Sequence, residues 1–162
     1  MHGLIPTAEK LADVLKKSGA TVAVAESSGG GLISAALLAV PGASAYYLGG
    51  AVVYTSQARS ALAGITDAEM KGLRSSSEPY AALLAKKIRE KHGATWGLAE
   101  TGAAGPTGNR YGDASGHSCI AVDGPVTLVL TLETASPDRQ ANMRKFALKA
   151  LQTLLTATES RR

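Results

Sequence analysis

The chain has 162 residues, the size of one domain with a single sizeable core. Hydrophobic residues make up 45% of it and charged residues 19%, a balance that excludes long disordered regions. The net charge of +4 arises partly from the run Lys86–Lys91 and the tail Arg161–Arg162; no aromatic platform or recognition helix accompanies them, so we expect no nucleic-acid partner.

Helices and strands alternate through the first third of the chain. Residues 6–18 have the period of an amphipathic helix, with Pro6 in its first turn and Gly19 at its end. The short apolar run at 21–25 predicts a central strand, and a glycine-rich turn leads from it into a helix at 32–40. A second buried strand is predicted at 47–54.

The segment from Ser27 to Ala58 contains no Asp, Glu, Lys or Arg. A membrane span of about 20 apolar residues is one interpretation of such a stretch. Pro41-Gly42 and Gly49-Gly50 break it into short pieces, however. We therefore expect a buried helix and a buried strand here, and no association with a membrane.

The rest of the chain continues the alternation and ends in a hairpin and a helix. Thr66 and Glu69 have the spacing of a capping box, and Ser77 is typical of a helix N-cap. Asp123-Gly124 is a typical hairpin turn. The elements expected are helices at 56–63, 67–73 and 78–92, a strand at 95–99, a glycine-rich loop at 100–115, strands at 117–122 and 126–133, and a last helix after Ser136-Pro137-Asp138.

This order of elements predicts the fold class. Apolar strands that alternate with helices form a sheet covered on both faces, and the hairpin makes that sheet mixed. We expect a single α/β domain over residues 1–162, with three α/β/α layers and a mixed, mostly parallel central sheet. Ligands of such sheets bind at the carboxyl ends of the strands, which here are followed by the loops after Ala25, Tyr54 and Ala99.

The loop after Ala25 reads Glu-Ser-Ser-Gly-Gly-Gly at residues 26–31. Glycines let the backbone approach an anion closely, and a serine there could be a nucleophile beside amides that hold an oxyanion. A helix N-cap with a flexible turn is the structural alternative. The loop has neither the GK[ST] ending of a Walker motif nor the GxSxG pattern, so neither of those site classes is indicated.

The other two loops carry a tyrosine, an arginine and more glycines. Tyr54 ends an apolar strand and Arg59 follows it by about one helical turn, so Arg59 could favour the Tyr54 phenolate in a proton relay. A tyrosine at the edge of the core and a surface arginine are the alternative. Residues 101–108 combine glycines with hydroxyls and predict a backbone cradle for a phosphate or an amide, or else a tight structural turn.

The histidines and the cysteine give no sign of a metal or a disulfide. His2, His92 and His117 are dispersed and have no acidic partners at metal-ligand spacing, so we expect no metal and no cofactor. The single Cys119 lies in an apolar segment, which predicts a buried, inert thiol. Because the N-terminus also lacks the pattern of a secretory signal, we expect a cytoplasmic location.

Three motifs in this order resemble the CinA C-terminal domain family, which includes the PncC enzymes that hydrolyse the carboxamide of nicotinamide mononucleotide. They are AESSGGG at 25–31, PGASAYYLGGAVVYTSQAR at 41–59 and ETGAAGPTG at 100–108, and the similarity extends over about residues 8–157. The resemblance implies a nucleotide substrate, no cofactor and assembly into a homo-oligomer.

The resemblance also assigns roles to single residues. Ser27 matches the family's nucleophile and Tyr54 its active-site tyrosine, whereas Arg59 stands where the family has a lysine. Arginine stays protonated and cannot replace a lysine that acts as a base. Residues 110–116 replace the family's Lys-Pro-x-Gly, so we expect the substrate end of the site to be rebuilt.

The predicted reaction is hydrolysis of a carboxamide to an acid and ammonia. Ser27 attacks, the amides near Gly29 and Gly30 hold the oxyanion, Tyr54 relays the proton and Arg59 favours its phenolate. The alternative is a non-catalytic nucleotide-binding module in which Arg59 pairs with a phosphate. The residues expected to bind the substrate are Glu26, Ser28, Gly29, Gly30, Gly31, Thr101, Gly102, Ala104, Gly105 and Thr107.

Overall fold

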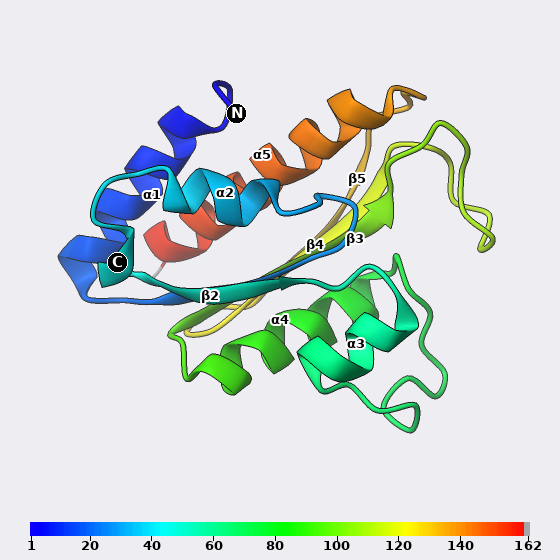
Figure 1. The fold of residues 1–162 in the computed structure, drawn as a ribbon, viewed down its shortest axis with the longest axis horizontal. Helices are drawn as coiled ribbons and strands as arrows, with labels where there is room; N and C mark the ends of the chain where they lie inside the picture. Colours follow the sequence, from blue (N-terminus) through cyan, green and yellow to red (C-terminus); the bar gives the residue numbers. More distant parts are fainter. Residues whose placement is uncertain (161–162) are drawn as a thin grey trace.

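A computed structural model describes residues 1–160, so the basic tail Arg161–Arg162 lies outside the described residues. A five-stranded sheet forms the middle layer and helices cover both of its faces (Figure 1). In chain order the elements are α1 (Ile5–Ser18), β1 (Val22–Glu26), α2 (Leu32–Leu38), the short 3-10 helix η1 (Ala43–Ala45), β2 (Tyr47–Val52), α3 (Ser56–Ala63), α4 (Glu78–His92), β3 (Trp96–Ala103), β4 (His117–Asp123), β5 (Leu128–Glu133) and α5 (Arg139–Glu159).

The sheet has the strand order β2-β1-β3-β4-β5. β1 runs parallel to both β2 and β3, whereas β4 is antiparallel to β3 and to β5. β5 therefore has the same direction as β1, β2 and β3, and β4 alone among these strands is reversed. This arrangement confirms the predicted α/β fold with a mixed, mostly parallel sheet.

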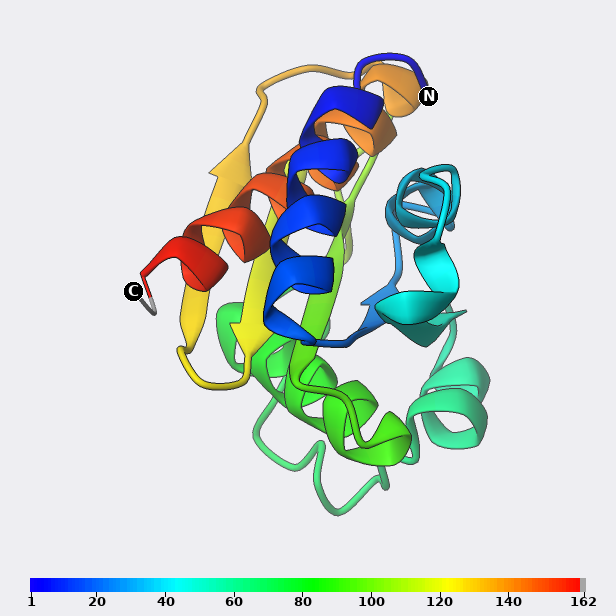
Figure 2. The ribbon, with the colours of Figure 1, turned by 90° about the vertical axis from the view of Figure 1, so that its left-hand side faces the viewer.

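Two hydrophobic layers hold the sheet between the helices. α1, α2 and α5 pack on one face, where Leu11 and Leu151 are fully buried, and α3 and α4 pack on the other, where Leu84 is fully buried (Figure 2). Small residues allow the close contacts. A Cβ at Gly97 of β3 would lie 2.0 Å from the carbonyl oxygen of Ala85 in α4, so this helix rests directly on the strand.

Local signals set the ends of α4 at the predicted positions. The hydroxyl of Ser77 accepts a hydrogen bond from the Tyr80 amide (3.4 Å), which satisfies a donor that the first helical turn leaves free. Gly93 follows the helix with a φ of +62°, a left-handed conformation that glycine adopts without a steric penalty.

Two predicted elements are corrected by the structure. The helix expected at 67–73 is a series of turns, although Thr66 and Glu69 do form the hydrogen bonds of a capping box. The strand expected to be buried at 47–54 ends at Val52 and lies at the edge of the sheet, where its residues alternate between half-buried and exposed. An edge strand has a partner on one side only, so it cannot be enclosed as a central strand is.

The glycine-rich loop expected at 100–115 begins later than predicted, because β3 continues to Ala103. Glu100, Thr101 and Gly102 pair with Ile120, Cys119 and Ser118 of β4. Cys119 is buried, as expected, and burial raises the pKa of its thiol. The thiolate is therefore disfavoured, which agrees with an inert cysteine.

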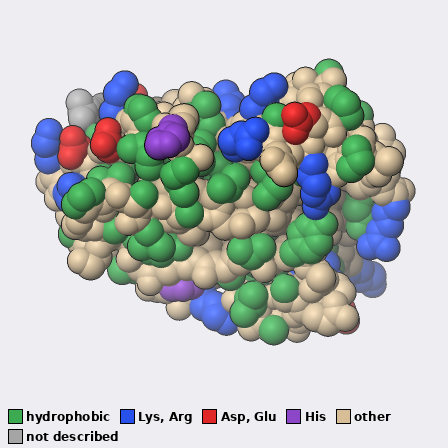
Figure 3. All heavy atoms as spheres, turned by 45° about the horizontal axis from the view of Figure 1, so that its top comes forward, with side chains coloured by type: hydrophobic (Ala, Val, Ile, Leu, Met, Phe, Trp, Pro, Cys, Tyr) green, Lys and Arg blue, Asp and Glu red, His purple; other side chains and the backbone are tan. Residues whose placement is uncertain are grey.

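The uncharged segment from Ser27 to Ala58 folds into α2, η1, β2 and the start of α3. Within residues 1–160, no helix has the length and apolar character needed to span a membrane. On the face that carries α1, α2 and α5, apolar side chains are scattered among polar ones, and basic side chains lie mostly towards the margins (Figure 3).

Candidate functional site

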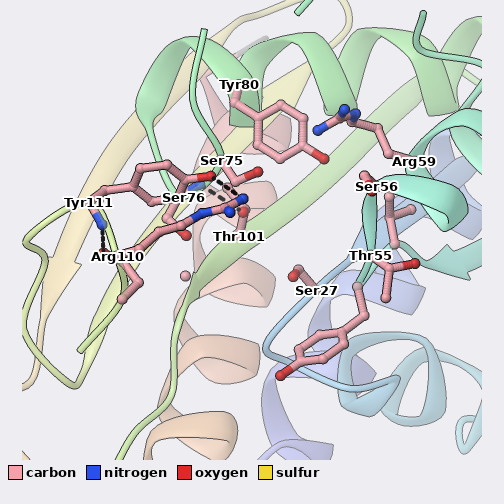
Figure 4. Close-up of a pocket in the computed structure, with 14 residues that line it drawn as sticks. Ser27, Thr55, Ser56, Arg59, Ser75, Ser76, Tyr80, Thr101, Arg110 and Tyr111 are labelled. Atoms are coloured by element: carbon pink, nitrogen blue, oxygen red, sulfur yellow. Dashed lines mark hydrogen bonds between the residues drawn. The ribbon is translucent and has the colours of Figure 1, made fainter. Parts of the chain in front are cut away.

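A cavity of about 420 Å³ lies where β1, β2 and β3 end. This is the edge at which open α/β sheets bind ligands. Five segments of the chain contribute to its walls (Figure 4). The lining residues are Ser27 after β1; Val53, Tyr54, Thr55, Ser56 and Arg59 after β2 and in α3; Ser75, Ser76 and Tyr80 at the start of α4; Thr101 and Gly102 of β3; and Asn109, Arg110 and Tyr111.

The structure brings some of the predicted site residues together in this cavity and leaves others outside it. Ser27, Tyr54, Arg59, Thr101 and Gly102 line it. The remaining predicted residues, Glu26, Ser28, Gly29, Gly30, Gly31, Ala104, Gly105 and Thr107, are not part of its lining. The hydrogen bonds of the first loop show what these outer residues do instead.

Glu26 caps α2. Its side chain is buried; Oε1 accepts hydrogen bonds from the amides of Gly31 (3.2 Å) and Ile33 (2.9 Å), and Oε2 accepts one from the amide of Ser34 (2.9 Å). The carboxylate therefore occupies the anion-binding end of this short helix. This geometry does not support the expected role of Glu26 in binding a substrate, because both carboxylate oxygens accept hydrogen bonds from backbone amides.

A second buried carboxylate, Glu100, holds the turn at Ser27. Oε2 of Glu100 accepts hydrogen bonds from the amides of Ser27 (3.1 Å) and Gly29 (2.7 Å), and Oε1 accepts one from the hydroxyl of Ser118 (3.1 Å). Burial raises the pKa of Glu100 to about 7, and the hydrogen bonds from the two amides oppose that rise. The pair Glu26 and Glu100 thus fixes both ends of the turn.

The hydrogen bonds within the turn do not support the prediction that the amides of Gly29 and Gly30 hold an oxyanion. The Gly29 amide is bonded to Glu100, and the Gly30 amide donates to the carbonyl oxygen of Ser27 (3.1 Å). Neither amide is therefore free to hold an oxyanion. The amide of Ser28 has no acceptor among residues 1–160, and the Ser28 hydroxyl donates to the carbonyl of Gly102 (2.6 Å), which ties the first loop to β3.

Tyr54 is paired with an arginine, but not with the predicted one. The residue is 61% exposed, and its hydroxyl accepts a hydrogen bond from Nη2 of Arg139 (3.3 Å). Nη1 of Arg139 donates to the carbonyl oxygen of Gly105 (2.6 Å), so this side chain spans from α5 to the third loop. Sequence analysis missed Arg139 because 85 residues separate it from Tyr54.

Arg59 lies against Tyr80 (Figure 4). Burial raises the pKa of the Tyr80 phenol, and the charge of Arg59 opposes that rise. Only 15% of the Arg59 side chain is exposed, and the one ion pair that it forms within residues 1–160, with the fully exposed Asp67, is long at 3.7 Å. The contacts observed for Arg59 and Tyr54 therefore do not include the predicted relay between them, and Arg59 is not the surface arginine of the alternative interpretation.

The opposite wall of the cavity comes from residues that sequence analysis did not assign to the site. Nη2 of Arg110 donates a hydrogen bond to the Tyr111 hydroxyl (3.2 Å), and this contact holds the Tyr111 pKa below its usual value. The guanidinium carbons of Arg74 and Arg110 each lie 5.2 Å from the centre of the Tyr111 ring, within the range of cation–π contacts. The sequence feature that could have indicated this wall is the departure from the family pattern at 110–116.

Asp113 fastens this wall to the segment before α4. Its carboxylate accepts two hydrogen bonds from Arg74 (2.7 and 3.1 Å) and one from Nδ2 of Asn109 (2.8 Å). The hydrogen bonds from Arg74 hold the Asp113 pKa below its usual value. The loop at 109–113 therefore has a defined position beside the cavity although much of it is exposed.

His117 supports the cavity wall from beneath. Its Nε2 lies 2.8 Å from the carbonyl oxygen of Ser76 and 3.6 Å from Asp113, and its Nδ1 bonds to Glu133. Burial lowers the pKa of His117, but the hydrogen bonds to Glu133 and Ser76 outweigh burial, so the pKa is raised. Because acceptors face both ring nitrogens, the geometry favours the doubly protonated ring.

The cavity is basic and rich in hydroxyl groups. Two guanidinium groups and no Asp or Glu side chain line it. Within residues 1–160, no group of three or more His, Cys, Asp or Glu side chains is placed to bind a metal ion. Such a lining suits an anionic, hydroxyl-rich ligand, since guanidinium groups bind phosphates and carboxylates and hydroxyls both donate and accept hydrogen bonds.

Comparison with known proteins agrees with the fold and identifies the family of the chain. Residues 5–158 match the family model described as the CinA C-terminal domain. A CinA-like protein from Desulfosudis oleivorans is 39% identical over 142 residues, which cover 87% of this chain and 34% of that protein. A CinA-like protein from Prochlorococcus marinus is 41% identical over 113 residues, covering 70% of this chain and 26% of that protein. The chain thus spans about a third of the length of the first relative and about a quarter of the second.

Solved structures match over most of both chains. The competence or damage-inducible protein from Enterobacter asburiae is 31% identical with a TM-score of 0.87, and the match covers 94% of this chain and 96% of that one. The CinA superfamily protein from Enterobacter cloacae is 29% identical with a TM-score of 0.88, covering 96% and 92%. The chain therefore belongs to the CinA C-terminal domain family.

Proposed function

We propose that this domain is a nicotinamide-nucleotide amidohydrolase, which converts the carboxamide of nicotinamide mononucleotide into an acid and ammonia. One observation carries the proposal: Ser27, which matches the family's nucleophile, opens into a cavity that contains two guanidinium groups and no carboxylate. A nucleotide phosphate needs such cations, and an amide to be attacked must lie beside such a serine.

The remaining lining supports a nucleotide as ligand. Thr55, Ser56, Ser75 and Thr101 surround the cavity with hydroxyls that match the hydrogen-bonding groups of a ribose and a phosphate. Tyr111 adds an aromatic ring on which a flat heterocycle can stack. Together these groups fit a polar ligand with one aromatic ring.

The proposed reaction begins at Ser27. Its Oγ attacks the carboxamide carbon, and the N–H of Ser28 donates to the oxygen on which negative charge develops. The Tyr54 hydroxyl relays the proton: it gives its own proton to the departing nitrogen and takes the serine proton in its place, so that the C–N bond breaks and ammonia leaves. Water then hydrolyses the ester on Ser27, which releases the acid and restores the serine.

The neighbours of these groups have positioning roles in this scheme. Glu100 binds the Ser27 amide and so fixes the nucleophile's backbone. Arg139 donates to the Tyr54 hydroxyl and keeps it beside the cavity. Arg59 cannot act as the base, because a guanidinium holds its proton to a pH above about 12.

A second candidate function is a nucleotide-binding module without turnover. The observation that favours it is the replacement of the family's lysine by Arg59, which lies against Tyr80 and removes a group that could accept a proton. In that case the cavity holds the same ligand, and the serine carries out no reaction. The two functions differ in one measurable product, ammonia.

The test measures ammonia release from nicotinamide mononucleotide by the native protein, Ser27→Ala and the control Ser60→Ala, and nucleotide binding by calorimetry. Ser60 is exposed and does not line the cavity, so its loss should change nothing. We expect release by the native protein and by Ser60→Ala, and none by Ser27→Ala, with binding retained in all three. Saturable binding to the native protein without ammonia would reject the hydrolase and support the binding module.

A further inference from the structure

The two edges of the sheet differ in how they are protected. At β5, charged groups border the strand: Glu133 ends it, and Glu78 accepts a hydrogen bond from the Thr131 hydroxyl (2.8 Å). β2, at the opposite edge, contains no charged residue, and neither do α2 and η1, which contact it. Proteins commonly place charges on an edge strand, because its free N–H and C=O groups can otherwise pair with another chain. β2 lacks this protection.

Exposed apolar side chains occur together around β2, which lies between α2 and α3 (Figure 1). Seven large hydrophobic side chains of residues 1–160 are exposed, and five of them belong to β2, to these two helices or to the segment that follows the strand. The five are Leu38, Leu48, Val52, Tyr54 and Leu62. Apolar side chains that are exposed as a group, and not singly, are typical of a contact surface.

The charge of this region indicates which partner fits it. From Ser27 to Leu62 the only charged side chain is that of Arg59, which is 15% exposed and lines the cavity. A charged partner would find no counter-charge on these residues, whereas a second copy of the chain brings no like charge against them. A two-fold axis sets the same surface of each copy against the other, so an uncharged, apolar surface around an unpaired strand is complementary to itself.

We infer that β2 forms the contact between two copies of this chain. The two β2 strands pair antiparallel across a two-fold axis, and the sheet continues from one copy into the other. The homo-oligomer expected from the family resemblance thereby receives a defined surface. The carboxyl end of β2 leads into residues 53–56, which line the cavity, so this pairing sets the start of the partner's β2 beside that end and covers the exposed Tyr54.

Sedimentation velocity over a range of protein concentrations tests the contact. We expect the native protein to be a dimer. Leu48→Lys places a charge on the edge strand and should raise the dissociation constant of the dimer at least tenfold. The matched control is Thr127→Lys, which adds the same charge at an exposed position just before the other edge strand, β5, and should leave the dimer intact.

Hydrogen exchange followed by mass spectrometry distinguishes strand pairing from a contact through side chains alone. The peptide that contains β2 should exchange at least tenfold more slowly in the native dimer than in Leu48→Lys, whereas the peptide that contains β5 should exchange equally in both. If Leu48→Lys does not fold, Leu62→Lys adds the charge at an exposed position of α3 and should weaken the dimer as well.

Four results would each overturn the inference: a monomeric native protein, an assembly with an odd number of copies, a dimer unaffected by both lysine variants, or a β2 that exchanges equally fast in the native protein and in Leu48→Lys. Ammonia release decides the proposed hydrolase separately, because assembly and exchange are measured without a substrate.

Discussion

Two segments face each other across the cavity, and they are held in different ways. The turn at 26–31 is fixed by Glu26 and Glu100, which are buried and accept hydrogen bonds from its amides. The loop at 104–116 is fastened at its exposed end by Asp113, through bonds to Arg74 and Asn109. The comparison indicates that the turn with the proposed nucleophile is anchored in the core, whereas the loop at the proposed substrate end is anchored near the surface.

The largest effect is expected from Glu26→Ala, which leaves three amides at the start of α2 without an acceptor. An unsatisfied buried group costs about 1–3 kcal/mol, so we expect the free energy of unfolding to fall by about 4 kcal/mol. Urea unfolding followed by the fluorescence of Trp96 measures it. Glu9→Ala, at an exposed site on α1, is the control and should change stability by less than about 0.5 kcal/mol. A similar small loss in both variants would contradict the structural role given to Glu26.

Glu100 predicts a pH dependence of stability. Its pKa in the folded protein is about 7, against an ordinary value of 4.5, so the folded state holds a proton that the unfolded chain releases. The contribution of Glu100 to the free energy of unfolding is greatest below pH 4.5 and declines until the pH passes about 7. At about 1.4 kcal/mol for each pKa unit, the decline is roughly 3–4 kcal/mol.

Glu100→Gln removes this titration while its side-chain oxygen can still accept from the turn. We expect the stability difference between native protein and variant to shift in favour of the variant as the pH rises from 4.5 to 8. Chemical unfolding at several pH values measures this difference. A difference that stays constant across the range would show that Glu100 does not titrate there.

His117, which lies in the wall of the cavity, predicts a smaller pH dependence of stability. Because its pKa is raised in the folded protein, its stabilising effect is complete below its ordinary pKa of 6.5 and is lost as the pH rises through the folded value. The groups that face it are Glu133, Asp113 and Cys119, and Glu133 is half-exposed, so its contribution is screened by solvent.

We expect His117→Gln to cost about 1 kcal/mol at pH 5.5 and progressively less at higher pH, because glutamine cannot carry the charge. His2→Gln, at the exposed N-terminus, is the control and should show no such trend. Thermal unfolding at pH 5.5, 7 and 8.5 suffices. An equal loss at all three values would mean that the charge of His117 plays no part.

The smallest effect on stability is expected in the loop at 104–116. Arg110→Gln alters an exposed residue of the loop and breaks one hydrogen bond, to Tyr111. The free energy of unfolding should change by less than about 0.5 kcal/mol. A loss as large as that of Glu26→Ala would show that the loop is part of the core after all.

Local sequence predicted the elements whose ends are set by local chemistry. α4 follows from the Ser77 cap, Pro79 and Gly93, and the antiparallel pairing of β4 and β5 follows from the turn that Asp123-Gly124 begins. Sequence did not predict that β3 continues through Glu100, because that extension depends on pairing with β4. It also gave no sign that Thr66 and Glu69 would cap a set of turns and not a helix.

In the candidate site, too, only residues marked by local sequence could be predicted. Ser27 directly follows β1 and Thr101 lies near the end of β3, so the predicted strand ends located both residues. Arg139 and Tyr80 reach the site from helices far along the chain, and no local pattern marks them. One signal was overlooked: each of two apolar strands reads Ala-Glu near its end, at Glu26 and Glu100, and an unpaired carboxylate in a buried strand needs a partner.

The central proposal is that the turn at 26–31 carries the nucleophile of the reaction and that the loop at 104–116 binds the nucleotide. Its most direct test is the dissociation constant of nicotinate mononucleotide, which is not hydrolysed, for the native protein, Ser27→Ala and Arg110→Gln. The account predicts a constant within about twofold of the native value for Ser27→Ala, and binding at least tenfold weaker for Arg110→Gln. Native affinity in Arg110→Gln, together with weakened binding in Ser27→Ala, would contradict it.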